Sequence, residues 1–424
     1  MRKPPAYHTY LLYEGLLSFA FALAFTYSLV YWTTVAALDP LQLVLVGTAL
    51  ESSVFLFEIP TGIVADVYSR RLSVIIGVFL LGIGIWLMGS IPLFFPIIAS
   101  QVLWGLGYTF TSGATQAWIT DEIGEEAAGG AFLRGSQAEQ LGALVGIPLS
   151  VLLATMRVNL PIQAGGILLL GLGLLLVFIM PEHGFTPTPP SERNTWTNML
   201  TTFQTGLGML RRRPALLTIL AVGFFYGLYS EAFDRLWVKL LLDNFNLPAL
   251  GRLGQVAWFG ILEMVGLLLS ALALEIVRRR LDTNTHRNIA RTLLFITAIL
   301  IVAIFSFAVT HSLWIVLLAY WAIYIIREVI SPIYITWVNQ RLDPAARATV
   351  ISMSSQVDAI GQISGGPALG LVGNTYGVRT AIAAAAFLLS PVLVLFARTM
   401  DHKEAAPIIR DHLLPDSILG KEKQ

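Results

Sequence analysis

The stretch SQAEQLGALVGIP at residues 136–148 recurs as SQVDAIGQISGGP at residues 355–367. The two stretches share a serine–glutamine pair, two glycines four residues apart and a proline, all at a constant offset of 219 residues. The acidic residue after the serine–glutamine pair is also kept, as Glu139 and Asp358. An offset of about half the chain indicates that one structural unit occurs twice.

A second pair of stretches, residues 105–118 and 324–337, lies at the same offset. It pairs serine with serine and tryptophan with tryptophan: Ser112 with Ser331, and Trp118 with Trp337. Both copies of the unit lie in apolar sequence. Duplicated halves within a membrane protein are typical of secondary transporters, which bind their substrate between the repeats.

The composition also indicates a polytopic membrane protein. Of the 424 residues, 56% are hydrophobic and 12% are charged, and the mean hydropathy is +0.72, whereas soluble domains have about 25% charged residues. The chain has no cysteine, which excludes disulfides and cysteine–metal sites. The first apolar stretch is too long for a signal-peptide core, so we expect it to be a retained membrane helix.

A membrane-spanning helix needs about 20 apolar residues, and the sequence offers twelve such segments. The predicted spans are residues 8–36, 41–66, 72–91, 94–120, 131–156, 160–180, 215–242, 252–277, 288–309, 312–340, 346–372 and 378–398.

The longest connection, residues 181–214, is a predicted linker between spans six and seven. Its apolar residues recur at helical spacing before a run of three arginines, which favours an amphipathic helix on the membrane surface: Trp196, Met199, Leu200, Phe203, Leu207 and Leu210. An ordinary linker with a few apolar residues is the alternative.

The basic residues predict the orientation, because Lys and Arg accumulate in cytoplasmic loops. With the N-terminus inside, the opposite side receives few of them: Arg157, Lys239, Arg252 and Arg379. We therefore expect a multi-pass protein of the cell's inner (plasma) membrane with both termini in the cytoplasm.

The second span ends in residues 58–71, EIPTGIVADVYSRR. This segment resembles the signature of the major facilitator superfamily between spans two and three, Gly-x-x-x-Asp-Arg-x-Gly-Arg-Arg/Lys. Gly62, Asp66, Arg70 and Arg71 fall in register, whereas a valine and a serine replace the usual Arg and Gly. In the family this motif holds the cytoplasmic gate shut in the outward-facing state. The alternative is that the two arginines only determine topology.

The resemblance implies an all-α membrane protein whose twelve transmembrane helices form two pseudo-symmetric six-helix bundles. The expected divisions are an N-terminal bundle at 1–180, the linker at 181–214, a C-terminal bundle at 215–398 and a cytoplasmic tail at 399–424.

Spans five and eleven carry glycines and a proline that resemble the Gly-x-x-x-Gly-Pro motif of the family's antiporters. Generic helix packing is the alternative, since glycines permit close helix approach. A departure concerns span four, where the antiporters carry an arginine and this chain carries Gln101. Either coupling uses other residues, or the protein is not a proton antiporter.

Ionisable residues inside spans are costly and therefore need a role. In the family, spans one, four, seven and ten line the central cavity. Span seven offers Glu231, Asp234 and Arg235 on one helix face, and span ten offers Arg327 and Glu328. With Glu139 and Asp358, these are the candidate substrate and proton-coupling residues. Structural ion pairing across the cavity is the alternative for them.

Near the middle of the predicted spans, and with Glu14 included, carboxyl groups outnumber arginines by eight to two. A surplus of acids in a low-dielectric site suits proton exchange and favours a cationic substrate. The sequence therefore predicts a secondary active transporter for proton-coupled export of lipophilic cationic compounds by alternating access, as in the bacterial multidrug exporters it resembles. The alternative is a proton-coupled uptake symporter in which Arg235 and Arg327 hold a small polar or anionic metabolite.

Other classes of protein fit less well. The six histidines lie at span ends or in loops, and no hydrolase or nucleotide-binding motif occurs in a suitable context. We therefore expect no enzyme activity, cofactor, metal site or nucleic-acid partner. The expected partners are a small-molecule substrate, protons and the lipid bilayer, with the chain as a monomer. An intramembrane hydrolase and a non-transporting receptor are the minor alternatives.

Overall fold

The computed structural model describes residues 6–187, 214–281, 285–340 and 344–401. The expected amphipathic linker helix and most of the tail lie outside these residues. Helices make up the regular structure of the described residues: α1 (Ala6–Thr34), α2 (Pro40–Val67), α3 (Arg70–Ser90), α4 (Phe94–Thr111), α5 (Ala114–Ile123), α6 (Glu125–Met156), α7 (Leu160–Ile179), α9 (Pro214–Asn244), the 3-10 turn η1 (Gly251–Leu253), α10 (Ala257–Arg280), α11 (His286–Val309), α12 (Leu313–Gln340), α13 (Pro344–Tyr376), α14 (Val378–Leu388) and α15 (Pro391–Asp401).

The twelve predicted spans are present. Ten helical segments in the described residues are long and apolar enough to cross a membrane, with α14 and α15 counted together. The pair α4–α5 and the long helix α13 complete the set. Most predicted boundaries lie within three residues of the observed ones, and the largest difference is at α6, which begins at Glu125 rather than at residue 131.

Two predicted spans are interrupted. The span predicted at 94–120 is broken between α4 and α5, where Gly113 adopts φ +71°, a conformation that glycine adopts without strain. The repeat places Pro332 opposite Gly113, and α12 accommodates that proline without a break. The last span is likewise divided into α14 and α15, since Pro391 begins α15.

Local capping explains where several helices begin. Asp39 and Gln42 form a reciprocal capping box at the start of α2, which satisfies two amide groups that the helix leaves free. At the start of α3, the Leu72 amide donates to Ser69 Oγ at 2.9 Å. Ser69 therefore caps α3 at the position where the family signature carries glycine.

The repeated glycines pack equivalent helices together in the two halves. α6 packs against α1, and α13 packs against α9. A Cβ atom on Gly142 would lie 2.3 Å from the Gly15 carbonyl oxygen, and one on Gly361 would lie 2.4 Å from the Phe224 carbonyl oxygen. Close packing thus accounts for these glycines, whereas the antiporter interpretation of the motif stays a prediction.

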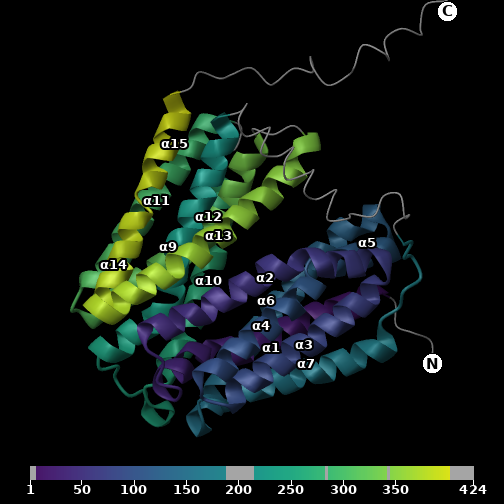
Figure 1. The fold of residues 1–424 in the computed structure, drawn as a ribbon, viewed down its shortest axis with the longest axis horizontal. Helices are drawn as coiled ribbons and strands as arrows, with labels where there is room; N and C mark the ends of the chain where they lie inside the picture. Colours follow the sequence, from purple (N-terminus) through teal and green to yellow (C-terminus); the bar gives the residue numbers. More distant parts are fainter. Residues whose placement is uncertain (1–5, 188–213, 282–284, 341–343, 402–424) are drawn as a thin grey trace, which may run out of the picture.

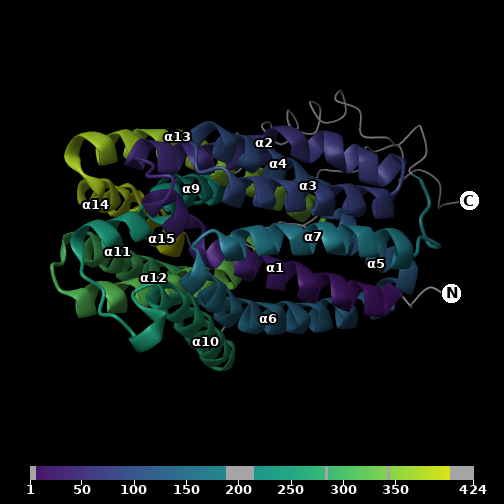
Figure 2. The ribbon, with the colours of Figure 1, turned by 90° about the horizontal axis from the view of Figure 1, so that it is seen from below.

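The two bundles meet along α2, which packs on α13 and α9, and along α6, which contacts α10. Figures 1 and 2 both place α2 beside α13. At one end of this contact the Leu41 amide donates to Asn374 Oδ1 at 3.0 Å. Toward the other end, where α5 and the end of α15 lie, the bundles diverge in Figure 1.

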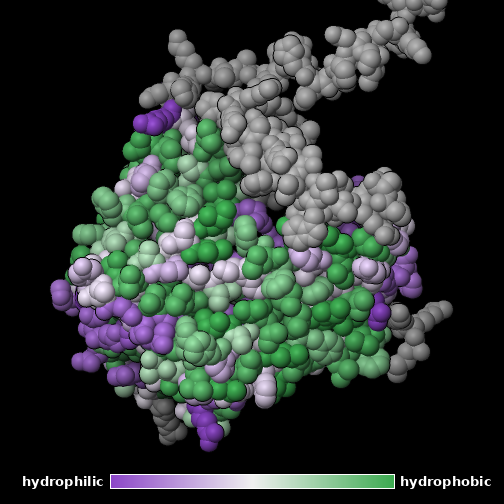
Figure 3. Space-filling model, viewed as in Figure 1, coloured by the Kyte–Doolittle hydropathy of each residue, from purple (hydrophilic) through white to green (hydrophobic). Residues whose placement is uncertain are grey.

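The outer surface of the helices is apolar. Large hydrophobic side chains are exposed on several helices, among them Phe178 of α7, Phe295 of α11 and Trp314 of α12. Figure 3 shows such side chains over most of the visible face, with hydrophilic groups gathered toward its ends. This distribution matches a bilayer, whose apolar core lies between two polar surfaces.

Candidate functional site

Three cavities lie among the helices, and two of them are lined by residues of both bundles. One of about 500 Å³ is lined by α9, α12 and α13, and one of about 470 Å³ by α1, α9, α10 and α12. They share Asp234, Arg327 and Ser331. A third cavity, of about 430 Å³, is lined by α1, α6, α10 and α12. The expectation that spans one, seven and ten face the cavity therefore agrees with these linings.

Span four takes no part in lining these three cavities. Instead Trp104 of α4 packs behind the wall that α1 forms. Its ring lies 5.7 Å from Phe25 and 6.3 Å from Phe21, and both phenylalanines face the third cavity. Gln101 is buried within the N-terminal bundle and hydrogen-bonds Ser100 Oγ at 3.3 Å, so it does not act as a cavity residue in this conformation.

A bidentate ion pair joins the two predicted cavity helices of the C-terminal bundle. Arg327 of α12 donates to both carboxylate oxygens of Asp234 on α9, with Nη2 at 2.8 Å from Oδ2. The side chains are 32% and 37% exposed, respectively, so the pair is open to the cavities. Charge-assisted bidentate pairs are among the strongest polar contacts in proteins. The pairing across the cavity corresponds to the alternative that the sequence left open for these residues.

The neighbouring pair on α9 has a different environment. Arg235 Nε donates to Glu231 Oε1 at 2.8 Å, and these side chains are only 17% and 2% exposed, respectively. Gly47 of α2 lies directly against them, because a Cβ atom there would be 1.4 Å from Glu231 Oε1. This pair therefore lies in the contact between the bundles and does not line the three cavities.

The other candidate acids occupy separate positions around the cavities. Glu328 is exposed and lines the 470 Å³ cavity. Asp358 lines the 500 Å³ cavity and accepts a hydrogen bond of 2.8 Å from Gln362 Nε2. Glu139 is exposed to the third cavity, which it lines with Glu14 and Glu263. The structure thus distributes the predicted site along the bundle contact instead of gathering it in one pocket.

Glu263 contributes to a link between the bundles. Thr26 Oγ1 of α1 donates to Glu263 Oε2 of α10 at 2.7 Å. At the next residue of α1, the hydroxyl of Tyr27 donates to the Val256 carbonyl oxygen at 2.8 Å. Both bonds cross from the N-terminal to the C-terminal bundle, so their geometry changes whenever the bundles move apart here.

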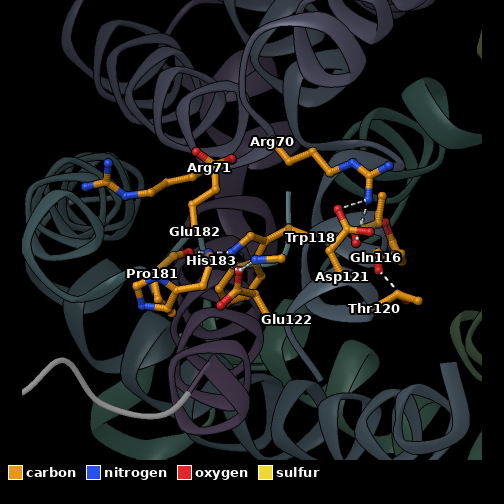
Figure 4. A network of polar contacts seen from close by, with 12 residues as sticks. Arg70, Arg71, Gln116, Trp118, Thr120, Asp121, Glu122, Pro181, Glu182 and His183 are labelled. Atoms are coloured by element: carbon orange, nitrogen blue, oxygen red, sulfur yellow. Dashed lines mark hydrogen bonds and ion pairs between the residues drawn. The ribbon is translucent and has the colours of Figure 1, made fainter. Parts of the chain in front are cut away.

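The arginines of the signature motif are engaged within the N-terminal bundle (Figure 4). Arg70 forms an ion pair with Asp121 at the end of α5. The Arg71 side chain donates from Nη2 to the Val177 carbonyl oxygen at 2.6 Å, and its backbone amide donates to Glu182 Oε1 at 2.9 Å. These contacts tie the start of α3 to α5 and to the segment after α7.

The other two motif residues lack such contacts. Asp66 is exposed and has no hydrogen bond or ion pair with another residue that the structure describes. A Cβ atom on Gly62 would meet no described atom within 4 Å. Among the described residues of α2, Glu58 makes the polar contact to the other bundle that is nearest in sequence to Gly62 and Asp66. Its Oε2 accepts a hydrogen bond of 2.7 Å from Gln356 Nε2. The gate therefore stays a prediction, with its residues unassembled in this conformation.

Three residues with a role here were not singled out in the sequence. The structure adds Gly47, Asp121 and Glu182, and gives Glu14 and Glu263 specific partners. Glu14 and Glu263 carry a signal in the sequence, since each is an acid within an apolar span. Gly47 carries none, because a glycine in a membrane helix is common and its partner is distant in sequence.

The family model of the Major Facilitator Superfamily matches residues 12–355. The chain belongs to the major facilitator superfamily. The chain is also 24% identical, over 365 residues, to an uncharacterized MFS-type transporter of Bacillus subtilis (strain 168) called YxaM, with 84% of this chain and 87% of that protein covered.

Solved structures of other superfamily members share the fold. The nucleoside transporter NupG is 16% identical and superposes with a TM-score of 0.73, covering 94% of this chain and all of its own. A bacterial homologue of the human lysosomal transporter Spinster, in an inward-facing and occupied conformation, is 13% identical with a TM-score of 0.70. It covers 93% of this chain and 97% of that chain. This superfamily member is therefore a multi-pass membrane transporter with the twelve-helix fold.

Proposed function

We propose that this transporter exports lipophilic cationic compounds in exchange for protons. The observation that supports this most is the charge of the cavities. Six carboxyl groups but only one arginine line the three cavities in the described residues: Glu14, Glu139, Asp234, Glu263, Glu328 and Asp358, against Arg327. A cation gains from this excess, whereas an anion would be repelled.

The alternative, proton-coupled uptake of an anionic metabolite, needs an arginine that is free to bind it. Arg327 is held by both oxygens of Asp234, and Arg235 is held by Glu231 beneath Gly47. An anion would have to displace a carboxylate from one of these pairs. The pairing therefore favours a cationic substrate.

The direction of transport depends on the orientation in the membrane. If both termini are cytoplasmic, as the basic residues predict, the end where Leu41 meets Asn374 faces outward and the diverging end faces the cytoplasm. A conformation of this kind opens its cavities to the cytoplasm, the side from which an exporter takes its substrate.

The Asp234–Arg327 pair offers a means of coupling. A proton on Asp234 removes the charge that holds Arg327 and so weakens the pair. Arg327 is then left with the electrostatic attraction of Glu328, which lines the same cavity. Each protonation state thus stabilises a different pairing, which lets a proton bias the equilibrium between two conformations.

Binding of a quaternary ammonium compound and of its uncharged carbon isostere to the purified protein tests this proposal. The ammonium group keeps its charge at every pH, so any pH dependence reports on the protein. A charge about 6 Å from a carboxylate in an effective dielectric of about 20 gains about 3 kcal/mol, which is about a hundredfold in affinity. The cation should bind more tightly, and increasingly so as pH rises. Tight binding of an anion, strongest at low pH, would instead favour the uptake alternative.

A further inference from the structure

We propose that Glu14 of α1 and Glu139 of α6 form a proton-binding pair that shares a single proton. The pair lies in the N-terminal bundle and contains neither member of the Asp234–Arg327 pair. Its role in the transport cycle depends on the proton coupling proposed above, but the shared proton itself does not.

The two carboxyl groups are held close together by the helices that carry them. Glu14 and Glu139 line the same cavity from neighbouring helices, and the Glu14 carboxyl interacts with the Glu139 carboxyl and with the Tyr10 hydroxyl. Ser18 Oγ donates to the Glu139 carbonyl oxygen at 2.7 Å, and Gly142 of α6 packs on the backbone of α1. This close packing fixes the spacing of α1 and α6, so the backbone positions of the two acids stay next to each other.

A shared proton follows from the chemistry of this contact. An ionised carboxylate only accepts hydrogen bonds, so two carboxyl groups bond each other only when one carries a proton. Two negative charges in such a position repel each other, and one of the two groups is then favoured as the neutral acid.

The surroundings offer no positive charge to replace the proton. No Lys, Arg or His lines this cavity among the described residues. The ionisable groups that face it from the neighbouring helices are Glu263 of α10 and Tyr324 of α12. On α1 itself the neighbours are Tyr10 and Tyr13.

Two other helices that pack on α1, α5 and α7, add no charge next to the pair. From α5, Thr115 contacts the hydroxyl of Tyr13, and α7 contains no ionisable residue between Leu160 and Ile179. Along α6, the nearest basic residue is Arg134, which donates to Gln137 Oε1 at 2.9 Å.

The C-terminal bundle does not repeat this arrangement. Phe19 contacts the glycines of α6 with the same backbone atoms that Leu228 uses against the glycines of α13. That register places Gly223 at the position of Glu14, while Asp358 stands at the position of Glu139 and bonds the amide of Gln362. The pair is therefore specific to the N-terminal half, which argues against a scaffold contact inherited with the repeat.

The two acids differ in their access to water. A site that exchanges protons needs at least one group that water can reach. Glu139 is exposed to the cavity, whereas Glu14 is only 7% exposed. A proton can thus enter through Glu139 and be held between the two groups.

Infrared titration of the purified protein tests the shared proton without any transport. We expect Glu14→Gln and Glu139→Gln each to remove the same C=O stretching band of a protonated carboxyl group, and the double variant to remove no more than either one. Glu58→Gln, at an exposed acid outside this cavity, is the matched control and should leave the band unchanged. A band that persists in both single variants would overturn the proposal, provided that thermal unfolding shows both to be folded.

Transport in proteoliposomes tests the role of the pair. Glu14→Gln should lower pH-driven accumulation at least tenfold, and by a clearly larger factor than it lowers substrate exchange between equal pools. Loss of the infrared band with unchanged pH-driven accumulation would overturn the coupling role. If the wild type itself shows no pH-driven transport but the band titrates and disappears in both variants, the proton-coupled export is wrong, whereas the shared proton is confirmed.

Discussion

Replacement of Gly47 by alanine should separate the two bundles at the end where α2 meets α9. The added Cβ atom would lie 1.4 Å from Glu231 Oε1 and 2.3 Å from Arg235 Nε. Both atoms belong to flexible side chains, but the pair is buried, so moving either group away from the new methyl group disturbs the 2.8 Å contact. Overpacking of this kind costs about 1–3 kcal/mol. Since the clash exists only while these helices are in contact, the equilibrium should shift about 5- to 150-fold toward the conformation that is open at this end.

Cysteine labelling measures this shift, because the chain has no native cysteine. Val44 is fully buried in the bundle contact, and Ile335 lines the 500 Å³ cavity and is 48% exposed. In the Gly47→Ala background, a water-soluble maleimide should label Val44→Cys faster and Ile335→Cys more slowly.

The matched control is Gly171→Ala in α7, where an added Cβ would meet nothing within 4 Å; it should change neither rate. Equal labelling of both cysteines in the wild-type and Gly47→Ala backgrounds would refute the reasoning, since the clash would then be relieved without any movement of the bundles. Transport should slow in Gly47→Ala because one conformation is disfavoured.

Three further predictions concern the gate, the coupling residues and the helix packing. Asp66→Asn should raise the fraction of molecules open at the diverging end and slow transport, and unchanged cysteine labelling with unchanged flux would remove the gating role. Asp234→Asn or Glu328→Gln should abolish pH-driven accumulation and retain exchange between equal pools. Glu263→Gln should affect coupling much less. If Asp234→Asn and Glu328→Gln both accumulate substrate like the wild type, other residues couple transport to protons. Gly142→Ala should lower the melting temperature markedly because its Cβ would meet rigid backbone at 2.3 Å, and a wild-type melting temperature would contradict the packing that holds α1 to α6.

The helices were predictable because a bilayer requires long apolar segments, and the sequence provides them. What the hydropathy missed were the interruptions. Ser112 and Gly113 lie inside a continuous apolar stretch, yet Gly113 adopts a left-handed conformation that ends α4. The repeat held a clue, since Pro332 occupies the matching position in the other half.

The candidate site was predictable by residue type but not by partner. The spacing of Glu231, Asp234 and Arg235 places them on one helix face, and Arg235 does pair with Glu231. The same spacing does not predict that Asp234 pairs with Arg327 on another helix. It also does not predict that α2 covers the Glu231–Arg235 pair. Those facts depend on how the helices rotate and pack, which no local pattern encodes.

The direction in which a pH gradient drives substrate tests the central claim most directly. Proteoliposomes with an imposed pH gradient and a radiolabelled quaternary ammonium compound on both sides suffice, whatever the orientation of the protein. An antiporter moves substrate against the proton flow, so the account predicts accumulation in the acidic compartment and none in the Asp234→Asn variant. Accumulation in the alkaline compartment would contradict it, because substrate and proton would then travel together as in an uptake symporter.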